Sequence, residues 1–213
     1  MQKRICCIFG AGDYSGITID KEKLADSFVI AADGGYLFLQ ENNIIPHLIV
    51  GDFDSIEIGE AEGHAVIRYP SEKDDTDMLL AIKEGMNRAC NTFLLYGGTG
   101  GRFDHTLANI QTLAYLAGEG MRGYLIGQNE VITAIHNEAF EVLREDWQGK
   151  YISVFCNGKA ATGVNLKGLK YSLGDAVVTA DFAIGVSNEF AAEKAQISVE
   201  NGTLIIVIER KHE

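Results

Sequence analysis

Hydrophobic residues in the first 128 positions gather in short runs separated by polar stretches. Several of these runs are almost continuously apolar, which is typical of strands buried on both faces of a parallel sheet. We therefore expect six strands in this part of the chain. They are Arg4–Gly10, Phe28–Asp33, Leu48–Phe53, Ala65–Tyr69, Thr92–Gly97 and Gly123–Gly127.

Two of the intervening stretches have the period of a helix. Met78, Ile82 and Met86 recur every four residues within Asp74–Cys90, so they fall on one helix face. Apolar residues in His105–Gly118 follow the same spacing. Strands that alternate with helices predict a mostly parallel sheet with helices packed on it.

The pattern changes after residue 128, where short β-like runs follow one another without a helical stripe. These runs are Val131–Ile135, Phe140–Leu143, Tyr151–Phe155, Ala161–Leu166, Ala195–Val199 and Thr203–Ile208. Turn signals separate them at Asn157-Gly158, Gly174-Asp175 and Asn201-Gly202, the last placed as in a hairpin. The fold class expected is α/β, with a Rossmann-like α/β domain over residues 1–128 and an all-β sandwich domain over residues 129–213.

The composition is that of a globular protein, with 46% hydrophobic and 23% charged residues among 213. This excludes a disordered, collagen-like or coiled-coil chain. Eighteen basic and 30 acidic residues give a net charge of −12, which disfavours nucleic acid and anionic membranes as partners. No apolar run approaches the roughly 20 residues of a membrane span, and the N-terminus lacks the features of a secretory signal. We expect a cytoplasmic protein.

Cysteine and histidine are sparsely distributed. Cys6, Cys7, Cys90 and Cys156 form no CxxC pair, so buried free thiols are favoured over metal or redox roles. The five histidines form no HxH or HExxH pair. A zinc enzyme is therefore not expected.

Clusters of Gly and Asp lie at or just beyond the ends of four predicted strands. They are Ala32–Gly35, Gly51–Ser55, Lys73–Asp77 and Gly97–His105. In a parallel α/β sheet, ligands bind beyond the carboxyl ends of the strands. We expect these four clusters to meet at one rim of the sheet.

Asp52 and Asp54 are two residues apart in an extended segment, so both carboxylates point to the same side. Such a pair suits magnesium, which prefers hard oxygen ligands. The alternative is a turn, because Asp and Ser favour turns through local hydrogen bonds. Three further acidic clusters on the same rim favour the metal interpretation.

Asp74, Asp75 and Asp77 open the first predicted helix. Carboxylates at a helix N-terminus cap it and complement its dipole, and one of the three is expected to do only that. Three acids within four residues exceed the need for a cap. Asp74 and Asp77 are three residues apart and share a helix face, as a second metal-facing pair requires.

The stretch Gly97–Gly101 joins a strand to a helix, and its glycines permit close approach of the backbone to a phosphate group. It is not a Walker A loop, and Gly10-Ala11-Gly12 is too short to indicate a dinucleotide site. Arg102 is a candidate phosphate clamp, since its forked donors match phosphate oxygens. The alternatives are a tight strand–helix turn and a solvated arginine.

Four motifs in this order closely resemble the thiamine pyrophosphokinase family, also called thiamine diphosphokinases. They read ADGG (Ala32–Gly35), GDFDS (Gly51–Ser55), KDDTD (Lys73–Asp77) and GGTGGRFDH (Gly97–His105). Gly185–Glu189 resembles, more weakly, the family's Ser-Asn segment near the thiamine site. Taken by itself, Ser187-Asn188 predicts a turn.

The resemblance implies transfer of the pyrophosphoryl group of ATP to the hydroxyl of thiamine, giving thiamine diphosphate and AMP, with Mg²⁺ as cofactor. It also implies a homodimer with thiamine bound between the catalytic domain of one subunit and the β-domain of the other. ATP and thiamine are then the small-molecule partners.

Motif matching assigns residue roles. The magnesium ligands are Asp52, Asp54, Asp74 and Asp77. The residues that bind ATP and its phosphates are Asp33, Gly34, Thr76, Gly98, Gly100, Gly101 and Arg102. The catalytic residues are Asp54, Asp77, Arg102 and Asp104. The thiamine-binding residues are Asp104, His105, Ser187 and Asn188.

The chemistry agrees with this assignment, because phosphoryl transfer needs positioning and charge neutralisation more than covalent help. Asp104 or Asp77 is expected to accept the hydroxyl proton of thiamine. Trp147 and Phe190 are candidates to stack on thiamine, although core packing is favoured for both. The family's thiamine-site tryptophan has no counterpart near Ser187.

Three alternatives remain at this level. A kinase acting on thiamine monophosphate would release ADP. In a second alternative, an enzyme with the same ATP site acts on a different alcohol, such as a pterin. A non-catalytic nucleotide or thiamine sensor is the third, and it predicts loss of acidic ligands that all four clusters retain.

Overall fold

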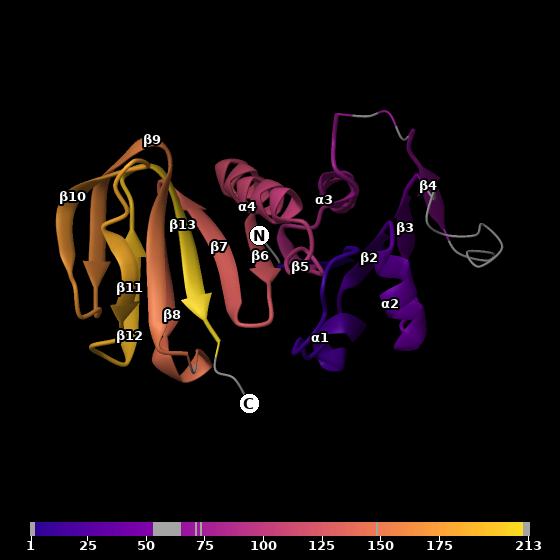
Figure 1. Cartoon of the computed structure of the whole chain (residues 1–213), viewed down its shortest axis with the longest axis horizontal. Helices are drawn as coiled ribbons and strands as arrows, with labels where there is room; N and C mark the ends of the chain where they lie inside the picture. The colour runs from indigo at the N-terminus through magenta and orange to yellow at the C-terminus, as the bar shows by residue number, and fades with distance from the viewer. Residues whose placement is uncertain (1–2, 53–64, 71, 73, 148, 211–213) are drawn as a thin grey trace. The chain divides into compact units, whose positions relative to one another are not determined.

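The structure is a computed structural model, and it describes residues 3–52, 65–70, 72, 74–147 and 149–210. The chain has a mixed α/β fold with a large sheet, and it divides into two compact units (Figure 1). One unit comprises Met1–Asn109 and Leu125–Gly127, and the other Ile110–Tyr124 and Gln128–Glu213. Helix α4 (Phe103–Gly118) and strand β6 (Arg122–Ile126) contribute residues to both units.

Parallel strands form the centre of the first unit. They are β1 (Ile5–Phe9), β2 (Phe28–Ala32), β3 (Leu48–Gly51), β4 (Val66–Arg68) and β5 (Thr92–Tyr96). Their order is β4-β3-β2-β1-β5, with parallel pairing at each step. All five strands, and β6, lie where the hydrophobic runs predicted them.

Helices cover both faces of these strands. Cys7 and Phe9 of β1 are buried in a cluster with residues of α1 (Lys21–Ala25) and α2 (Gly35–Glu41). On the other face, Cys6 and Phe93 approach Gly85 of α3 (Asp77–Asn87). Figure 1 shows α3 on the side of the strands opposite to α1 and α2. Burial on both faces explains why these strands are almost continuously apolar.

Helix α3 is shorter than Asp74–Cys90, the range that its periodicity predicts. Thr76 is the N-cap, with extended backbone, and its side chain accepts a 3.2 Å hydrogen bond from the amide of Leu79. Asp74 and Asp75 therefore precede the helix. The expectation that Asp74 and Asp77 share a helix face was wrong, because the threonine hydroxyl takes the capping role.

The second unit is rich in strands. They are β7 (Glu130–His136), β8 (Ala139–Leu143), β9 (Tyr151–Lys167), β10 (Leu173–Thr179), β11 (Gly185–Glu189), β12 (Lys194–Ser198) and β13 (Asn201–Glu209), with a short 3-10 helix η2 (Arg144–Asp146) after β8. The first part of β9 pairs with β11 and β13, and its last part pairs with β10 and β12. Trp147 and Phe190 pack against the core of this unit, as favoured from the sequence.

Three turn predictions in this unit were wrong. Asn157-Gly158 lies inside β9, Gly174-Asp175 inside β10, and Asn201-Gly202 at the start of β13. β13 pairs with β7 and β9 and does not form a hairpin with β12. The strands tolerate these residues because register shifts in the β10–β9 and β13–β9 pairings accommodate the irregular backbone. The segment of Ser187-Asn188 is likewise a strand, β11, and not a turn.

The four cysteines are free thiols, with Cys6, Cys7 and Cys90 buried and Cys156 half-buried. This confirms the prediction for three of them and shows Cys156 to be more accessible. No helix within the described ranges combines the length and apolarity needed to cross a membrane.

Candidate active site

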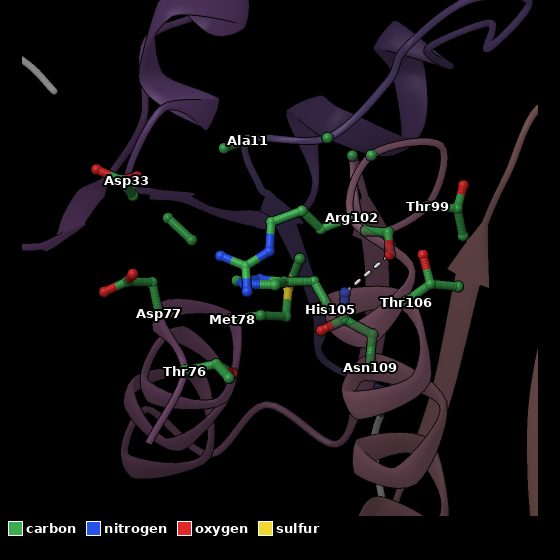
Figure 2. Close-up of a pocket in the computed structure, with 15 residues that line it drawn as sticks. Ala11, Asp33, Thr76, Asp77, Met78, Thr99, Arg102, His105, Thr106 and Asn109 are labelled. Carbon is green, nitrogen blue, oxygen red and sulfur yellow. Dashed lines mark hydrogen bonds between the residues drawn. The ribbon is translucent and has the colours of Figure 1, made fainter. Parts of the chain in front are cut away.

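A pocket of about 290 Å³ lies at the carboxyl ends of β1, β2 and β5 (Figure 2). In the order β3-β2-β1-β5, β2 lies on one side of β1 and β5 on the other, so the strand order reverses at β1. Such a point is the usual ligand position of an α/β sheet. The lining residues are Ala11, Gly12, Ala32, Asp33, Thr76, Asp77, Met78, Gly97, Gly98, Thr99, Gly101, Arg102, His105, Thr106 and Asn109. All of them belong to the first unit.

Backbone hydrogen bonds hold the glycine loop against the segment that follows β1. The amide of Gly12 donates to the carbonyl of Gly97 at 2.8 Å, and the amide of Asp13 donates to that of Thr99 at 3.0 Å. Within the loop, Gly97 and Gly100 have φ of 62° and 79°, values that favour glycine. The loop conformation is therefore set by its own glycines and by its pairing with residues 12–13.

The first turns of α4 contact the glycine loop from the side opposite to residues 12–13. Asn109 is buried and its amide donates a 2.8 Å hydrogen bond to the carbonyl of Gly98. Arg102, His105 and Asn109 are spaced to fall on one face of the helix and its N-terminal extension, and all three line the pocket.

Two carboxylates border the same space from different elements. Asp33 follows β2 in a left-handed conformation, with φ of 46°, and its amide donates to the carbonyl of Val50 at 2.8 Å. Asp77 lies in the first turn of α3. Figure 2 shows the two carboxylates on one side of the pocket, and the side chain of Arg102 extends toward them from the glycine loop. The pocket thus presents both signs of charge.

Arg102 and Asp104 form an exposed ion pair. Nη2 of Arg102 lies 2.6 Å from Oδ2 of Asp104, and its Nε donates to Oδ1 at 3.2 Å. Asp104 also accepts a hydrogen bond from the amide of His105 at 3.0 Å. The hydrogen bond between them lowers the pKa of Asp104 and raises that of Arg102, so each charge stabilises the other.

The donor chemistry of the pocket is compatible with a hard divalent cation. Magnesium in phosphate-handling sites is commonly bound through one or two carboxylates, with phosphate oxygens and water as further ligands. Asp33 and Asp77 supply two carboxylates to the pocket wall. Among the described residues, no three His, Cys, Asp or Glu side chains gather as a metal-binding group. A metal ion here would therefore share its coordination with the ligand.

The structure brings many of the expected residues together. Those that line the pocket are Asp33, Thr76, Asp77, Gly98, Gly101, Arg102 and His105. Four others lie within two positions of a lining residue without lining the pocket themselves: Gly34, Asp74, Gly100 and Asp104. Asp52 follows β3, a strand that contributes no lining residue. Asp54 lies outside the described residues. Asp75, also a candidate cap, instead pairs with Lys83 of α3 at 2.6 Å.

Several lining residues were not expected. They are Ala11, Gly12, Ala32, Met78, Gly97, Thr99, Thr106 and Asn109, of which Ala32, Gly97 and Thr99 fall within the quoted clusters. A signal for Gly12 was present in Gly10-Ala11-Gly12, at the end of the first predicted strand. For Thr106 and Asn109 the signal was their helical spacing from Arg102.

Ser187 and Asn188 lie in β11 of the second unit and differ sharply in exposure. Ser187 is exposed, with φ of 56°, and its amide donates to Oγ of Ser153 at 3.0 Å. Asn188 is buried; its Nδ2 donates to the carbonyl of Tyr171 at 2.7 Å, and its Oδ1 accepts from the amide of Tyr171 at 2.9 Å. The side-chain amide of Asn188 is thus fully engaged with the backbone of Tyr171, whereas Ser187 is exposed to solvent.

Two family models match most of the chain. The family model described as "Thiamin pyrophosphokinase, catalytic domain" matches residues 20–125, and "Thiamin pyrophosphokinase, vitamin B1 binding domain" matches residues 138–204. The chain is 30% identical to a thiamine pyrophosphokinase of Bacillus subtilis over 183 residues, 84% of this chain and 85% of that protein.

Solved structures are similar over almost the full length. A crystal structure of thiamine pyrophosphokinase from Bacillus subtilis superposes with a TM-score of 0.87 at 28% identity, covering 99% of this chain and 100% of that one. A thiamin pyrophosphokinase family protein from Enterococcus faecalis gives a TM-score of 0.82 at 28% identity, with the same coverage.

Proposed function

Because the chain belongs to the thiamine pyrophosphokinase family, we propose that the pocket at the ends of β1, β2 and β5 binds ATP for pyrophosphoryl transfer. The chain is an ATP-dependent transferase that converts thiamine to thiamine diphosphate, with AMP as the second product. The observation that carries the assignment of the pocket is its wall, in which a glycine loop, one guanidinium and two carboxylates border one space.

The phosphates of ATP lie against the Gly97–Gly101 loop and the N-terminus of α4. Backbone amides at such a turn and the helix dipole favour anions, and glycines let the phosphate approach the chain. Arg102 extends over the pocket and supplies forked donors to phosphate oxygens. Asp33, Gly34 and Thr76 complete the nucleotide site.

The enzyme uses a divalent metal ion, and we assign Mg²⁺ to it. Asp77 on the pocket wall is the ligand best supported by position. Asp52 lies directly after β3 and is half-buried, and Asp54 and Asp74 join the ligand set from the sequence motifs. When bound, the metal would add to the positive charge of Arg102 in neutralising the triphosphate.

The reaction is attack of the thiamine hydroxyl on the β-phosphorus of ATP, with AMP leaving. Asp104 is an ionised carboxylate held beside Arg102, so it accepts a hydrogen bond from the hydroxyl and orients it. The same pairing makes Asp104 a weak base, and Asp77 is the second carboxylate positioned to take the proton. His105 lines the pocket beside Asp104, and we assign it a contact with thiamine.

Thiamine binds in a homodimer, between the catalytic domain of one subunit and the partner subunit's Ser187. Large apolar side chains are exposed around β10 and β11, as at a protein interface. They are Tyr171, Val177, Phe182, Ile184 and Val186, of which Phe182 is 69% exposed. Asn188 positions this segment through its hydrogen bonds to Tyr171.

The catalytic part is a Rossmann-like domain over residues 1–128, and the thiamine-binding part is a β-sandwich over residues 129–213. The two family matches end and begin between residues 125 and 138, which supports this division. We place the protein in the cytoplasm, because its four cysteines remain free thiols.

Product analysis tests the assignment. The protein is mixed with Mg-ATP and thiamine, and AMP is resolved from ADP. Equal amounts of AMP and thiamine diphosphate are expected, and Arg102→Ala should reduce both together. ADP would overturn transfer from the β-phosphorus, AMP formed only with another alcohol would overturn thiamine as acceptor, and no turnover with any acceptor would favour a sensor.

A further inference from the structure

Tyr14 does not line the pocket, yet it contacts the backbone that shapes it. Its hydroxyl donates a 2.5 Å hydrogen bond to the carbonyl of Gly10, directly after β1. Its ring stacks on Phe38 of α2 with 3.7 Å between ring centroids and an interplanar angle of 6°. Burial raises the pKa of the hydroxyl, so the proton that bonds Gly10 is present throughout the neutral range.

The same tyrosine faces the first glycine of the loop. A Cβ on Gly97 would lie 2.5 Å from the hydroxyl of Tyr14 and 2.6 Å from the carbonyl oxygen of Gly10. Tyr14, Gly10 and Gly97 therefore meet at one point, where the Tyr14–Gly10 hydrogen bond leaves room for a glycine alone. The left-handed φ of 62° at Gly97 begins the turn of the loop there.

A second contact of the same kind lies further along the loop. A Cβ on Gly100, whose φ is 79°, would lie 2.5 Å from Cβ of Asp13. The amide of Asp13 in turn donates to the carbonyl of Thr99 at 3.0 Å. Asp13 and Tyr14 are adjacent, so two neighbouring residues pack against the two left-handed glycines of the loop.

Local hydrogen bonds hold this segment in place. Oδ1 of Asp13 accepts from the amide and the hydroxyl of Ser15, at 2.9 and 2.7 Å. The amide of Ile17 donates to the carbonyl of Tyr14 at 3.1 Å. The segment is thus folded on its own contacts and on the aromatic stack of Tyr14 with Phe38 and Phe9.

We propose that Tyr14 is a positioning residue for ATP, which holds the Gly10–Asp13 backbone as a template for the phosphate-binding loop. This inference rests on the proposed role of the Gly97–Gly101 loop in binding phosphate. A tyrosine that only filled the core would contribute to stability and leave ATP affinity unchanged. A positioning tyrosine changes ATP affinity without changing that for thiamine.

Two variants separate the ring from the hydroxyl. Tyr14→Phe keeps the stack on Phe38 and removes the bond to Gly10, and Tyr14→Leu removes both. Leu24→Ala is the matched control, since Leu24 is buried in the same hydrophobic cluster and belongs to α1. Arg102→Ala reports on the phosphate site itself. For each protein we would measure Tm, both KM values, and the Kd for α,β-methylene-ATP, in which the bond that breaks is blocked.

Tyr14→Leu should raise KM and Kd for the nucleotide about tenfold, and Tyr14→Phe about threefold, the effect of one hydrogen bond. KM for thiamine should stay within about twofold in both, and Leu24→Ala should lower Tm while nucleotide Kd is unchanged. If Tyr14→Leu does not fold, the nucleotide Kd of Tyr14→Phe alone tests whether Tyr14 positions the loop.

Unchanged nucleotide Kd in the Tyr14 variants, or an equal rise in both KM values, would overturn the inference. The parallel Arg102→Ala variant separates this from failure of the proposed site. If Arg102→Ala weakens the nucleotide analogue and the Tyr14 variants do not, only the role of Tyr14 is wrong. If Arg102→Ala has no effect either, the phosphate site lies elsewhere.

Discussion

The side-chain amide of Asn109 donates a 2.8 Å hydrogen bond to the main-chain carbonyl of Gly98. Both residues are buried and both line the pocket, so this contact joins the second turn of α4 to the middle of the glycine loop. The loop is therefore fixed from two sides. Asn109 holds it from the helix, and the amides of Gly12 and Asp13 hold it from the segment after β1.

Asn109→Leu should destabilise the protein and weaken nucleotide binding together. The substitution leaves the buried carbonyl of Gly98 without its side-chain donor, at a cost of about 1–3 kcal/mol. Urea unfolding measures the stability, and calorimetry with α,β-methylene-ATP measures the affinity. Gln111→Leu is the control on the exposed side of α4, expected within about 0.5 kcal/mol of the parent. Unchanged nucleotide affinity in Asn109→Leu would show that the loop holds its shape without this bond.

Asp77→Asn should remove activity while the fold is retained. Asp77 borders the pocket, and loss of one charge there is expected to lower kcat about 100-fold and to raise the Mg²⁺ concentration needed. The helix start survives because Thr76 remains the cap, and the lost dipole interaction costs about 0.3–1 kcal/mol.

Asp75→Asn is the matched control for Asp77→Asn. It removes an acidic residue two positions away whose carboxylate pairs with Lys83, and a pair this exposed contributes about 0–1 kcal/mol. Its kcat should stay within about threefold of the parent. Equal losses in the two variants would mean that the acidic segment acts through its overall charge and not through Asp77.

The strand pattern of the first unit was predictable because its physical cause is local. Buried parallel strands must be apolar on both faces, and the runs at Ile5–Phe9 and Thr92–Tyr96 record that directly. The clustering of the pocket was predictable for a similar reason, since parallel strands place their carboxyl ends on one edge. Asp33, Asp77 and Arg102 meet there although they are far apart in sequence.

The rest depended on contacts that sequence does not reveal. Asn201-Gly202 has the composition of a hairpin turn, but the pairing partners of β13 are β7 and β9, chosen by packing over long range. Asn188 resembled a surface turn residue, yet its amide is buried against Tyr171. Thr76 is the N-cap of α3, with extended backbone. Three aspartates beside it are equally good capping residues, so the sequence alone did not single out the threonine.

The pKa of Asp104 should rise toward its ordinary value of 3.8 in Arg102→Ala, because the arginine hydrogen bond is the main cause of its lowering. A carboxylate with a lowered folded-state pKa adds stability above its unfolded pKa and loses it as pH falls through the folded one. The pair is exposed, so the effect on stability is small. A ¹³C carboxyl NMR titration checks the direction, and an unmoved midpoint would contradict the pairing in solution.

If the chain forms the proposed homodimer through this surface, Phe182→Asp should shift it toward a monomer. Phe182 is 69% exposed between β10 and β11, and Val177 of β10 and Val186 of β11 are also exposed, so a charge at Phe182 opposes burial against a second subunit. Light scattering after size exclusion measures the mass, and activity should fall with it if thiamine binds across the dimer. Ile45→Asp is the control, since Ile45 is 76% exposed in the first unit. Equal mass and activity for Phe182→Asp and the parent would contradict the interface.

Ser187 and Asn188 should separate into a contact residue and a supporting residue. Ser187 is exposed, so Ser187→Ala should raise KM for thiamine more than KM for ATP, with little change in Tm. Asn188→Ala removes two hydrogen bonds between a buried side chain and the backbone of Tyr171, so the free energy of unfolding should fall by about 1–3 kcal/mol. Its KM for thiamine should rise as well, because the strand that carries Ser187 is loosened.

Thermal unfolding and steady-state kinetics on both variants measure these effects, with Ser198→Ala on β12 as the control strand position. An equal or larger effect of Ser187→Ala on KM for ATP would move the thiamine contact away from β11.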